Sequence, residues 1–584
     1  MLDTFQQNFE IRQIPLSIKS LKKKVETFLQ RFELRLDDVD EYYGVFAVGE
    51  DELLGGGGLK DNVIKCIAVS DDLQDTGLGM KLISHLYTTA LNNGNTSVKV
   101  FTKPKNKDIF ESLAFHTIAS SDKAILLENG NGLKEYCNYL SSLKKEGTNG
   151  AIVMNANPFT KGHRYLVETA SKMVDNLYII VVKEDKSLFS YQERKSMIEQ
   201  GTKDIENVVV CKGSDYAISA ATFPTYFLKE LTDATDTHIT LDLDLFSTYI
   251  APALGISKRF AGSEPTDNLT ARYNVLMKEK LSARGIEFVE IERLKQKESV
   301  VNATGLRKSL FENNLEGALN FAYKTSVPYM LSFLASQALQ QELDTTPKPG
   351  LVDKQDNGAH KDMDYSLMCK SIKTLHPYFT RLAETGFQKE LPQVREIQSI
   401  GLEAEKAMLE STNGVNTHKG ALFAMGLLLV SSANLLYNNT LTEESLRKTI
   451  SSLAKQFPAP QNTHGSEVLK ENKIVGALDN AILAYPDLFE SWLPYYRNIK
   501  TDVYSLQKTL LFIMTTLEDS NVYYRRGKQM AQIVKQQAKA LLESFSSFAL
   551  EKMNRDFVKE NVSPGGAADM LSLTLFVASI LSEK

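Results

Sequence analysis

The pattern of apolar residues changes along this chain, and this change limits the possible folds more than any other feature. From residue 150 to about residue 325, short apolar runs typical of buried strands alternate with segments of helical periodicity. Beyond residue 325 only helical periodicity remains, while residues 1 to 145 mix strands and helices and end in KKEGTNG, a linker-like segment. Because 584 residues exceed one hydrophobic core, we predict a multidomain protein with an α+β domain (1–145), an α/β parallel-sheet domain (146–325) and an all-α C-terminal domain (326–584).

Short apolar runs predict the individual strands. In the first domain these runs are YYGVFAV, Val63 to Val69 and SVKVF, and we expect Gly55–Gly58 to form a flexible hairpin turn. In the second domain the expected strands are AIVMN, NLYIIVV, VVVCKG, HITLDLDLF, RFAGS and IEFVEIE. Strands that alternate with helices form parallel sheets, and such sheets bind ligands at the carboxyl ends of the strands, where the strand order reverses.

Composition excludes several classes of protein. With 43% hydrophobic and 24% charged residues, the chain is neither disordered nor fibrous, and its net charge of −5 disfavours nucleic-acid and anionic-membrane surfaces. The four cysteines are far apart, which favours a reducing compartment over a disulfide framework or a cysteine-built zinc site. The start lacks the apolar core of a secretion signal, and serines and asparagines interrupt the uncharged stretch from Gly420 to Thr442, so we expect a buried helix and a cytoplasmic protein.

The segment Ala151 to His163, AIVMNANPFTKGH, gives the sharpest local signal. Its strand is expected to end at Asn155 and a helix to start near Gly162, where the free N–H groups of the first turn attract phosphate. Gly162 permits close approach of a ligand, and His163 adds a polar contact in the same turn. Taken alone, the histidine would equally fit a helix cap or a residue packed on the sheet.

NPFTKGHR resembles the TxGH form of the nucleotidylyltransferase superfamily signature, and NATGLR (302–307) resembles its second signature. The resemblance implies attack on the α-phosphate of ATP with release of pyrophosphate, and it implies His163 and Arg307 as catalytic residues. Thr160 stands where many members carry a first histidine. Arg194 stands where the superfamily places another phosphate-facing cation, although it also fits a solvated helix charge. The implied nucleotide-binding residues are Asn157, Thr160, Gly162, Arg164, Arg194, Asn302 and Thr304.

Three further segments, ATFPTYFLKE (221–230), LDLDLFSTYIAPALGI (241–256) and GSEPTDNLTARYN (262–274), resemble the citrate lyase ligase family. That family activates acetate with ATP as acetyl-adenylate and passes the acetyl group to a thiol on the acyl carrier subunit of citrate lyase. The implied partners are therefore acetate and that thiol-bearing subunit, and no nucleic acid or membrane is expected.

The first domain carries QDTGLG between an apolar strand and a helical run, which resembles the pyrophosphate loop of the GNAT acetyltransferase family. The implied residues of this CoA-like phosphate loop are Gln74, Gly77 and Gly79. NKDIFESLAF (106–115) resembles a later segment of that fold, with Ala114 in place of the usual glycine. We see no acid or base placed for amine acetylation, so a retained fold that only docks a partner is the alternative.

The helical domain begins with TPKPGLVDKQDNGAHKDMD (346–364), which is dense in acidic and basic residues. Acidic side chains suit Mg²⁺ and lysines suit triphosphate oxygens, while a solvated loop is the alternative. NTHKGALF (416–423) and SPGGAADML (563–571) each place a glycine and a polar group at the start of an apolar helix, which favours phosphate binding.

These segments, with QNTHG (461–465) and EDSNVYYRRG (518–527), resemble the triphosphoribosyl-dephospho-CoA synthase family. The family joins ATP to dephospho-CoA with loss of adenine, a step that needs an anionic face and a proton donor. We expect His360 and Asp362 to be catalytic, with His418 as an alternative proton donor, whereas His464 also fits a structural role. We expect Asp353 and Asp364 to bind Mg²⁺, and the expected nucleotide contacts are Lys348, Lys419, Ser563, Gly565 and Gly566. The stretch around Gly476 lacks an arginine and acidic residues expected from the family.

Together the resemblances imply a bifunctional enzyme of citrate lyase maturation, a ligase and transferase that uses ATP and Mg²⁺. Two alternatives stay open. One is a nucleotidylyltransferase of a small cofactor acceptor, and the other is a non-catalytic scaffold that binds the acyl carrier protein.

Overall fold

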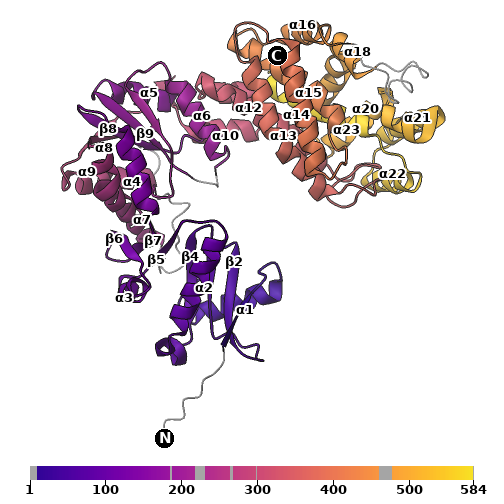
Figure 1. Cartoon of the computed structure of the whole chain (residues 1–584). Helices are drawn as coiled ribbons and strands as arrows, with labels where there is room; N and C mark the ends of the chain where they lie inside the picture. The colour runs from indigo at the N-terminus through magenta and orange to yellow at the C-terminus, as the bar shows by residue number, and fades with distance from the viewer. Residues whose placement is uncertain are drawn as a thin grey trace. The chain divides into compact units, whose positions relative to one another are not determined.

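The computed structural model describes residues 9–183, 187–217, 231–263, 268–296, 299–458 and 476–582 (Figure 1). By its packing the chain divides into two compact units. The first comprises Met1–Asn157 with Lys161–Val301, and the second comprises Pro158–Thr160 with Asn302–Lys584. A mixed sheet and a parallel sheet lie in the first unit and helices dominate the second, which confirms the multidomain layout. The boundaries near residues 145 and 325 stay predictions.

A seven-stranded mixed sheet forms the first part of unit one. Its order is β1-β2-β3-β4-β5-β7-β6, with β4 and β5 parallel and the other neighbours antiparallel. The strands are β1 (Phe9–Gln13), β2 (Glu41–Ala47), β3 (Gly55–Lys60), β4 (Val63–Val69), β5 (Ser97–Thr102), β6 (His116–Ser120) and β7 (Ile125–Gly130). The helices are α1 (Lys19–Gln30), α2 (Leu78–Asn92), α3 (Lys107–Glu111) and α4 (Gly132–Leu143).

The prediction of a hairpin turn at Gly55–Gly58 is wrong, because these glycines form the start of the buried strand β3. Large neighbouring side chains fill the space that other residues would need. A Cβ at Gly56 would lie 2.6 Å from the Tyr42 hydroxyl, and one at Gly57 would lie 2.7 Å from Leu86. The glycine run therefore allows close packing inside the sheet rather than flexibility.

A five-stranded sheet, all parallel, forms the second part of unit one, with the order β10-β9-β8-β11-β12. From the central strand β8 the chain adds strands first on one side and then on the other, so the order reverses between β8 and β11. The strands are β8 (Asn149–Met154), β9 (Asn176–Val181), β10 (Val208–Cys211), β11 (Ile256–Gly262) and β12 (Glu287–Ile291), and β13 (Lys295–Gln296) pairs with β14 (Ser299–Val300). The accompanying helices are α5 (Lys161–Ser171), α6 (Tyr191–Thr202), α7 (Leu231–Leu245), η3 (Phe246–Ile250), α8 (Ala251–Leu254) and α9 (Asn268–Ser282).

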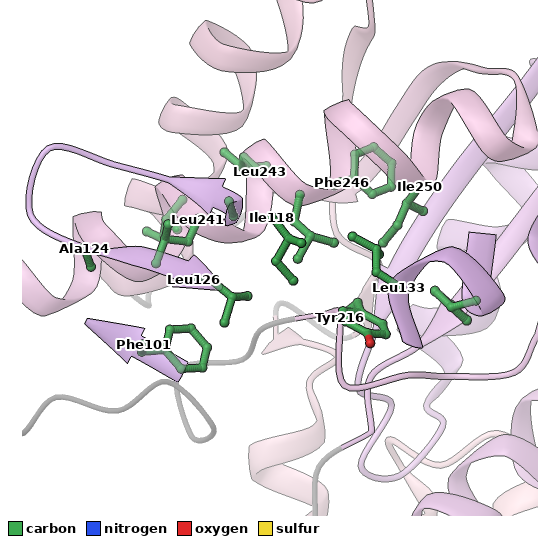
Figure 2. Packing of buried hydrophobic residues seen from close by; sticks show 14 of the residues in the cluster. Phe101, Ile118, Ala124, Leu126, Leu133, Tyr216, Leu241, Leu243, Phe246 and Ile250 are labelled. Atoms are coloured by element: carbon green, nitrogen blue, oxygen red, sulfur yellow. The ribbon is translucent and has the colours of Figure 1, made fainter. Parts of the chain in front are cut away.

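The strand predicted at HITLDLDLF is wrong, because this segment is the end of α7. Ile239, Leu241, Leu243 and Leu245 are all almost completely buried. Alternating apolar residues point to different sides of a helix, so the pattern also fits a helix that is buried on several sides. Figure 2 shows Leu241 and Leu243 beside Ile118 and Leu126 of the mixed sheet, in one hydrophobic cluster that includes both parts of unit one.

The second unit is an irregular helical assembly around α15 (Lys419–Tyr437), which contacts α12, α13, α14, α16 and α23 (Figure 1). Although α15 is long and apolar enough to cross a membrane, 78% of its apolar window is buried within the protein, as expected for a core helix. The other main helices are α10 (Ala303–Phe311), α11 (Leu315–Leu319), α12 (Val327–Asp344), α13 (Tyr365–Gly386), α14 (Val394–Ser411), α16 (Glu443–Ala454), α18 (Ala477–Ile482), α19 (Leu493–Ile499), α20 (Ser505–Thr516), α21 (Ser520–Glu543), α22 (Ser547–Lys559) and α23 (Gly565–Ile580).

Candidate active sites

The loop after β8 lies where ligands bind in sheets of this kind. β8 ends at Met154 and α5 begins at Lys161, so the predicted phosphate loop joins the central strand to a helix start beside the reversal of strand order. His163 and Gly162 lie in the first turn of α5, and burial lowers the pKa of the Lys161 amine in the same turn. The strand–loop–helix context predicted from the sequence is confirmed.

Arg194 of α6 holds this loop together. The guanidinium is completely buried and donates hydrogen bonds to the main-chain oxygens of Asn155 (2.8 Å), Val182 (2.9 Å) and Phe189 (3.1 Å). It also donates to the side-chain oxygen of Asn155 at 2.6 Å. The alternative of a solvated helix charge is therefore wrong. The geometry makes Arg194 a positioning residue at the ends of β8 and β9, and direct contact with a nucleotide stays a prediction.

Two other residues predicted to contact nucleotide also have defined partners in unit one. The side-chain oxygen of Asn157 accepts a hydrogen bond from the Phe189 N–H at 3.1 Å. Arg164 donates to both carboxylate oxygens of Asp204, at 2.6 and 2.8 Å, and to Glu168 on its own helix. These contacts order the loop and α5, and nucleotide contact by either residue stays a prediction.

The middle of the loop, Pro158–Thr160, packs with the second unit. Phe159 is fully buried, and its carbonyl accepts hydrogen bonds from the Ser326 hydroxyl (2.6 Å) and the Tyr323 N–H (3.3 Å). The neighbouring Thr160, only 1% exposed, forms a β-bridge with Ala322. The segment that follows α11 thus fixes the backbone of this part of the signature.

The second signature, NATGLR, begins helix α10 as predicted. The side chain of Asn302 caps the helix by accepting a hydrogen bond from the Gly305 N–H at 2.7 Å. Arg307 lies one turn further along the helix and donates to the Thr304 hydroxyl at 3.1 Å. A shared ATP contact by His163 and Arg307 stays a prediction.

In the mixed sheet, the loop predicted to bind a CoA-like phosphate leads into α2. Gly77 has a φ of +77°, a conformation that favours glycine, and α2 begins at the next residue, while Gly79 lies in its first turn. Gln74 donates to Asp71 at 2.6 Å. Ala114 has a φ of +62°, which explains why this fold usually places glycine there. Phosphate binding stays a prediction.

In the helical unit, Asp353 shapes the loop that precedes α13. Its carboxylate is 2% exposed and accepts the N–H groups of Lys348 (3.0 Å), Gln355 (2.7 Å) and Asp356 (3.1 Å). Asp364 caps α13 through the Leu367 N–H at 2.8 Å. Both oxygens of Asp353 accept backbone N–H groups, and binding of Mg²⁺ by Asp353 and Asp364 stays a prediction. Among the residues that the structure describes, no group of three His, Cys, Asp or Glu could hold a metal ion.

His360 is held between two elements of the same unit. Arg525 of α21 contacts its Nδ1 at 3.2 Å, and the hydroxyl of Ser563 contacts its Nε2 at 2.7 Å. Because Arg525 is a donor only, Nδ1 must accept, so the ring carries its proton on Nε2 and donates to Ser563. Burial and the Arg525 charge lower the pKa of His360 to about 4, so the imidazole is neutral at neutral pH. Asp362 lies 3.9 Å from Nδ1 and is largely exposed.

His418, which precedes the first residue of α15, is more deeply buried than His360 and is only 3% exposed. Its Nδ1 contacts the Ser371 hydroxyl at 2.8 Å, whereas its buried Nε2 has no hydrogen-bond partner in the described part of the chain. Burial and the nearby Lys348 charge lower its pKa to about 4. Lys348 is itself 1% exposed and forms an ion pair with Glu342 of α12. The neighbouring Lys419 pairs with Glu405 at 2.5 Å. The predicted nucleotide contacts of Lys348 and Lys419 are untested.

Carboxylates of the protein occupy the two helix starts that we expected to bind phosphate. Asp519 accepts a hydrogen bond from the Ala567 N–H of α23 at 2.9 Å. Asp569 of α23 lies against the start of α15, where a Cβ at Gly420 would be 2.1 Å from its carboxylate. Nucleotide contact by Gly565 and Gly566 stays a prediction.

Three carboxylates that the sequence analysis did not single out, Glu342, Asp519 and Asp569, lie near the predicted residues Lys348 and His418. We call these three residues the carboxylate group. The charges of Glu342 and Asp519 both act on Asp569, and with burial they raise its pKa well above the usual range. Burial raises the pKa of Asp519 to about 6. Asp519 and Asp569 lie inside the quoted motifs EDSNVYYRRG and SPGGAADML, but helical periodicity gives no sign that they meet.

The structure also covers some of the segments that carry the family resemblances. The segment 241–256 forms the end of α7, η3 and α8. Three other segments lie wholly or partly outside the described residues: ATFPTYFLKE, QNTHG with His464, and part of GSEPTDNLTARYN.

Comparison with known proteins gives three family matches. The citrate lyase ligase C-terminal domain matches residues 149–330, ATP:dephospho-CoA triphosphoribosyl transferase matches residues 329–584, and an acetyltransferase (GNAT) domain matches residues 15–124. The last match agrees with the mixed sheet and the loop before α2.

Individual relatives cover the two halves separately. The citrate (pro-3S)-lyase ligase of Klebsiella pneumoniae is 40% identical over 329 residues, which are 55% of this chain and 96% of the relative. The ligase of Escherichia coli is 36% identical over 53% of this chain and 90% of the relative. A probable 2-(5″-triphosphoribosyl)-3′-dephosphocoenzyme-A synthase of Streptococcus mutans is 37% identical over 42% of this chain and 94% of the relative. The chain therefore belongs to the citrate lyase ligase family in its first half and to the triphosphoribosyl-dephospho-CoA synthase family in its second.

Proposed function

We propose that this protein is a bifunctional enzyme of citrate lyase maturation. Its first half acetylates the prosthetic-group thiol of citrate lyase at the expense of ATP, and its second half makes the precursor of that prosthetic group from ATP and dephospho-CoA. One observation carries the proposal: each half matches nearly the whole length of relatives that are named for one of these two activities.

In the first half, acetate attacks the α-phosphate of ATP and pyrophosphate leaves, and the thiol of the acyl carrier subunit then displaces AMP. The loop after β8 supports this role, because it places a helix start and His163 at the reversal of strand order. Arg194 keeps a positive charge close to this loop, where it donates to the main-chain oxygens of Asn155, Val182 and Phe189. A fixed cation near the triphosphate favours the negative charge of the leaving pyrophosphate.

In the second half, a ribose hydroxyl of dephospho-CoA attacks the anomeric carbon of ATP and adenine leaves. The transition state resembles an oxocarbenium ion, so a negatively charged surface stabilises it. The carboxylates of Glu342 and Asp519 supply negative charge near Asp569 within the helical unit. In this proposal Mg²⁺ arrives bound to the substrate ATP, and both reactions take place in the cytoplasm.

A product assay tests the ligase half. With ATP, acetate and the thiol form of citrate lyase, we expect pyrophosphate, AMP and an acetyl-thioester on the carrier. His163→Ala should reduce this activity by about 10²-fold or more, and His116→Ala, at an exposed histidine of β6, is the matched control. A stable nucleotide conjugate that forms without acetate would instead indicate a small-acceptor nucleotidylyltransferase.

A second assay tests the synthase half. ATP with dephospho-CoA should yield free adenine and the triphosphoribosyl product, and His163→Ala should leave this yield unchanged. Formation of only ADP or AMP would refute the proposed reaction. Binding of the carrier without turnover in either assay would indicate a scaffold.

A further inference from the structure

We propose that Asp569 is the acid that gives a proton to the departing adenine, a role that rests on the proposed function of the helical half. The proposal combines two independent observations, the placement of Asp569 within the carboxylate group and the unpartnered ring nitrogen of His418.

The position of Asp569 is fixed by the start of α15. Gly420 lies so close that a Cβ there would be only 2.1 Å from a carboxylate oxygen of Asp569. As a whole residue Asp569 is half-buried, whereas Asp353 and Lys348 are buried. The carboxyl group of Asp569 therefore lies directly against the first turn of α15.

The groups around Asp569 favour its protonated form. Burial is the main cause that raises the pKa of Asp569 well above the ordinary range, and the negative charges of Glu342 of α12 and Asp519 at the start of α21 add to it. Lys348 is paired with Glu342 and so neutralises part of that charge. A carboxylic acid that stays neutral in such surroundings can donate a proton near neutral pH.

Neither histidine that we considered from the sequence fills this role as an imidazolium. Burial brings the pKa of both His360 and His418 to about 4, so both rings are neutral at neutral pH. His360 also has both ring nitrogens engaged, by Arg525 and Ser563. His418 differs because its Nε2, in a side chain only 3% exposed, is buried without a hydrogen-bond partner among the described residues.

The step balances as follows. The bond between the anomeric carbon and the adenine nitrogen breaks, and adenine takes its electron pair together with the Asp569 proton. The ribose hydroxyl oxygen of dephospho-CoA bonds to the same carbon, and its proton passes to Nε2 of His418. The attacking hydroxyl becomes strongly acidic as it bonds to a cationic carbon, so a weakly basic imidazole is sufficient. Solvent then returns a proton to Asp569 and removes one from His418.

The leaving group provides the sharpest test. Asp569→Asn keeps the shape of the side chain but has no acidic proton, so adenine release from ATP should fall by about 10²-fold or more. N7-methylated ATP carries a cationic base that leaves as a neutral molecule, so the same variant should lose less than about fivefold with this substrate. His418→Gln should lose activity equally with both substrates. Asp556→Asn, at an exposed aspartate of α22, is the matched control.

The pH dependence of adenine release is a second test of Asp569, and it needs only the natural substrate ATP. Wild-type adenine release should decline as pH rises through the pKa of Asp569, because the acid is lost, and the residual activity of Asp569→Asn should lack this decline. Equal losses with both substrates, or the same alkaline decline in the variant, would overturn the proposal. If the wild type released no adenine at all, the proposed function itself would fail, which is a separate result.

Discussion

Arg194 and Lys348 are both cations that the fold buries almost completely, with 0% and 1% of their surface exposed, but their surroundings differ. Arg194 donates to three main-chain oxygens and to the amide oxygen of Asn155. Lys348 is paired with the Glu342 carboxylate, and two further carboxylates lie in the same group.

The difference shows how one chain provides opposite electrostatic environments for the same substrate. Arg194 is a fixed cation at the carboxyl ends of β8 and β9, which suits attack at a triphosphate. In the helical unit, burial and the carboxylates of Glu342 and Asp519 favour the protonated form of Asp569, and negative charge at this place suits a cationic sugar carbon. The following experiments test this contrast, in order of decreasing expected effect.

Arg194→Met should have the largest effect. The variant leaves several buried oxygens without a donor, so we expect a loss of about 4 kcal/mol or more in the free energy of unfolding of the first unit. Ligase activity should disappear while adenine release persists. Urea denaturation and the two product assays measure these effects, and Arg272→Gln, at an exposed ion pair with Asp236, is the control. An unchanged unfolding midpoint would mean that the hydrogen bonds of Arg194 do not stabilise the first unit.

Lys348→Met should destabilise the helical unit by about 3 kcal/mol, because it leaves the Glu342 carboxylate buried without its partner. The double variant Lys348→Met with Glu342→Gln should recover much of that stability, but not adenine release. A double-mutant cycle in urea separates the two effects. If the double variant were as unstable as the sum of the single variants, the pair would not be coupled.

Gly420→Ala should separate activity from stability. Its Cβ would displace the Asp569 side chain, whereas the Cβ of Gly426→Ala, in the same helix, meets only Leu382 at 3.4 Å. We expect roughly tenfold or greater loss of adenine release for the first variant, since small displacements of catalytic groups are costly, and near wild-type release for the second. Similar activities of the two variants would argue against a role for Asp569.

Gly77→Ala should have the smallest effect. At a φ of +77° an alanine costs about 1 kcal/mol, so the unfolding midpoint of the first unit should fall slightly. If the loop only supports the fold, both activities should stay unchanged. A raised KM for the carrier thiol with an unchanged kcat would instead indicate that this loop binds the CoA-like arm.

Local sequence patterns predicted the parallel sheet, its phosphate loop and the helical half, because strand runs, helix starts and glycines depend on neighbouring residues. They failed at Gly55–Gly58 and at HITLDLDLF, where tertiary packing decides between turn, strand and helix. In the helical half they located the charged loop but not its roles, since Asp353 serves the backbone. The carboxylate group is formed by residues 342, 519 and 569, and no local pattern predicts that such distant residues meet.

The anchoring of Phe159 bears on any attempt to produce the two activities as separate proteins. A ligase fragment must extend at least to Ser326 to keep the partners of the Phe159 carbonyl, yet α12, which carries Glu342 for the other reaction, begins at the very next residue. Residues 302–326 also belong to the compact unit that contains α12, so a cut that separates the ligase residues from the helical half divides the packing of that unit.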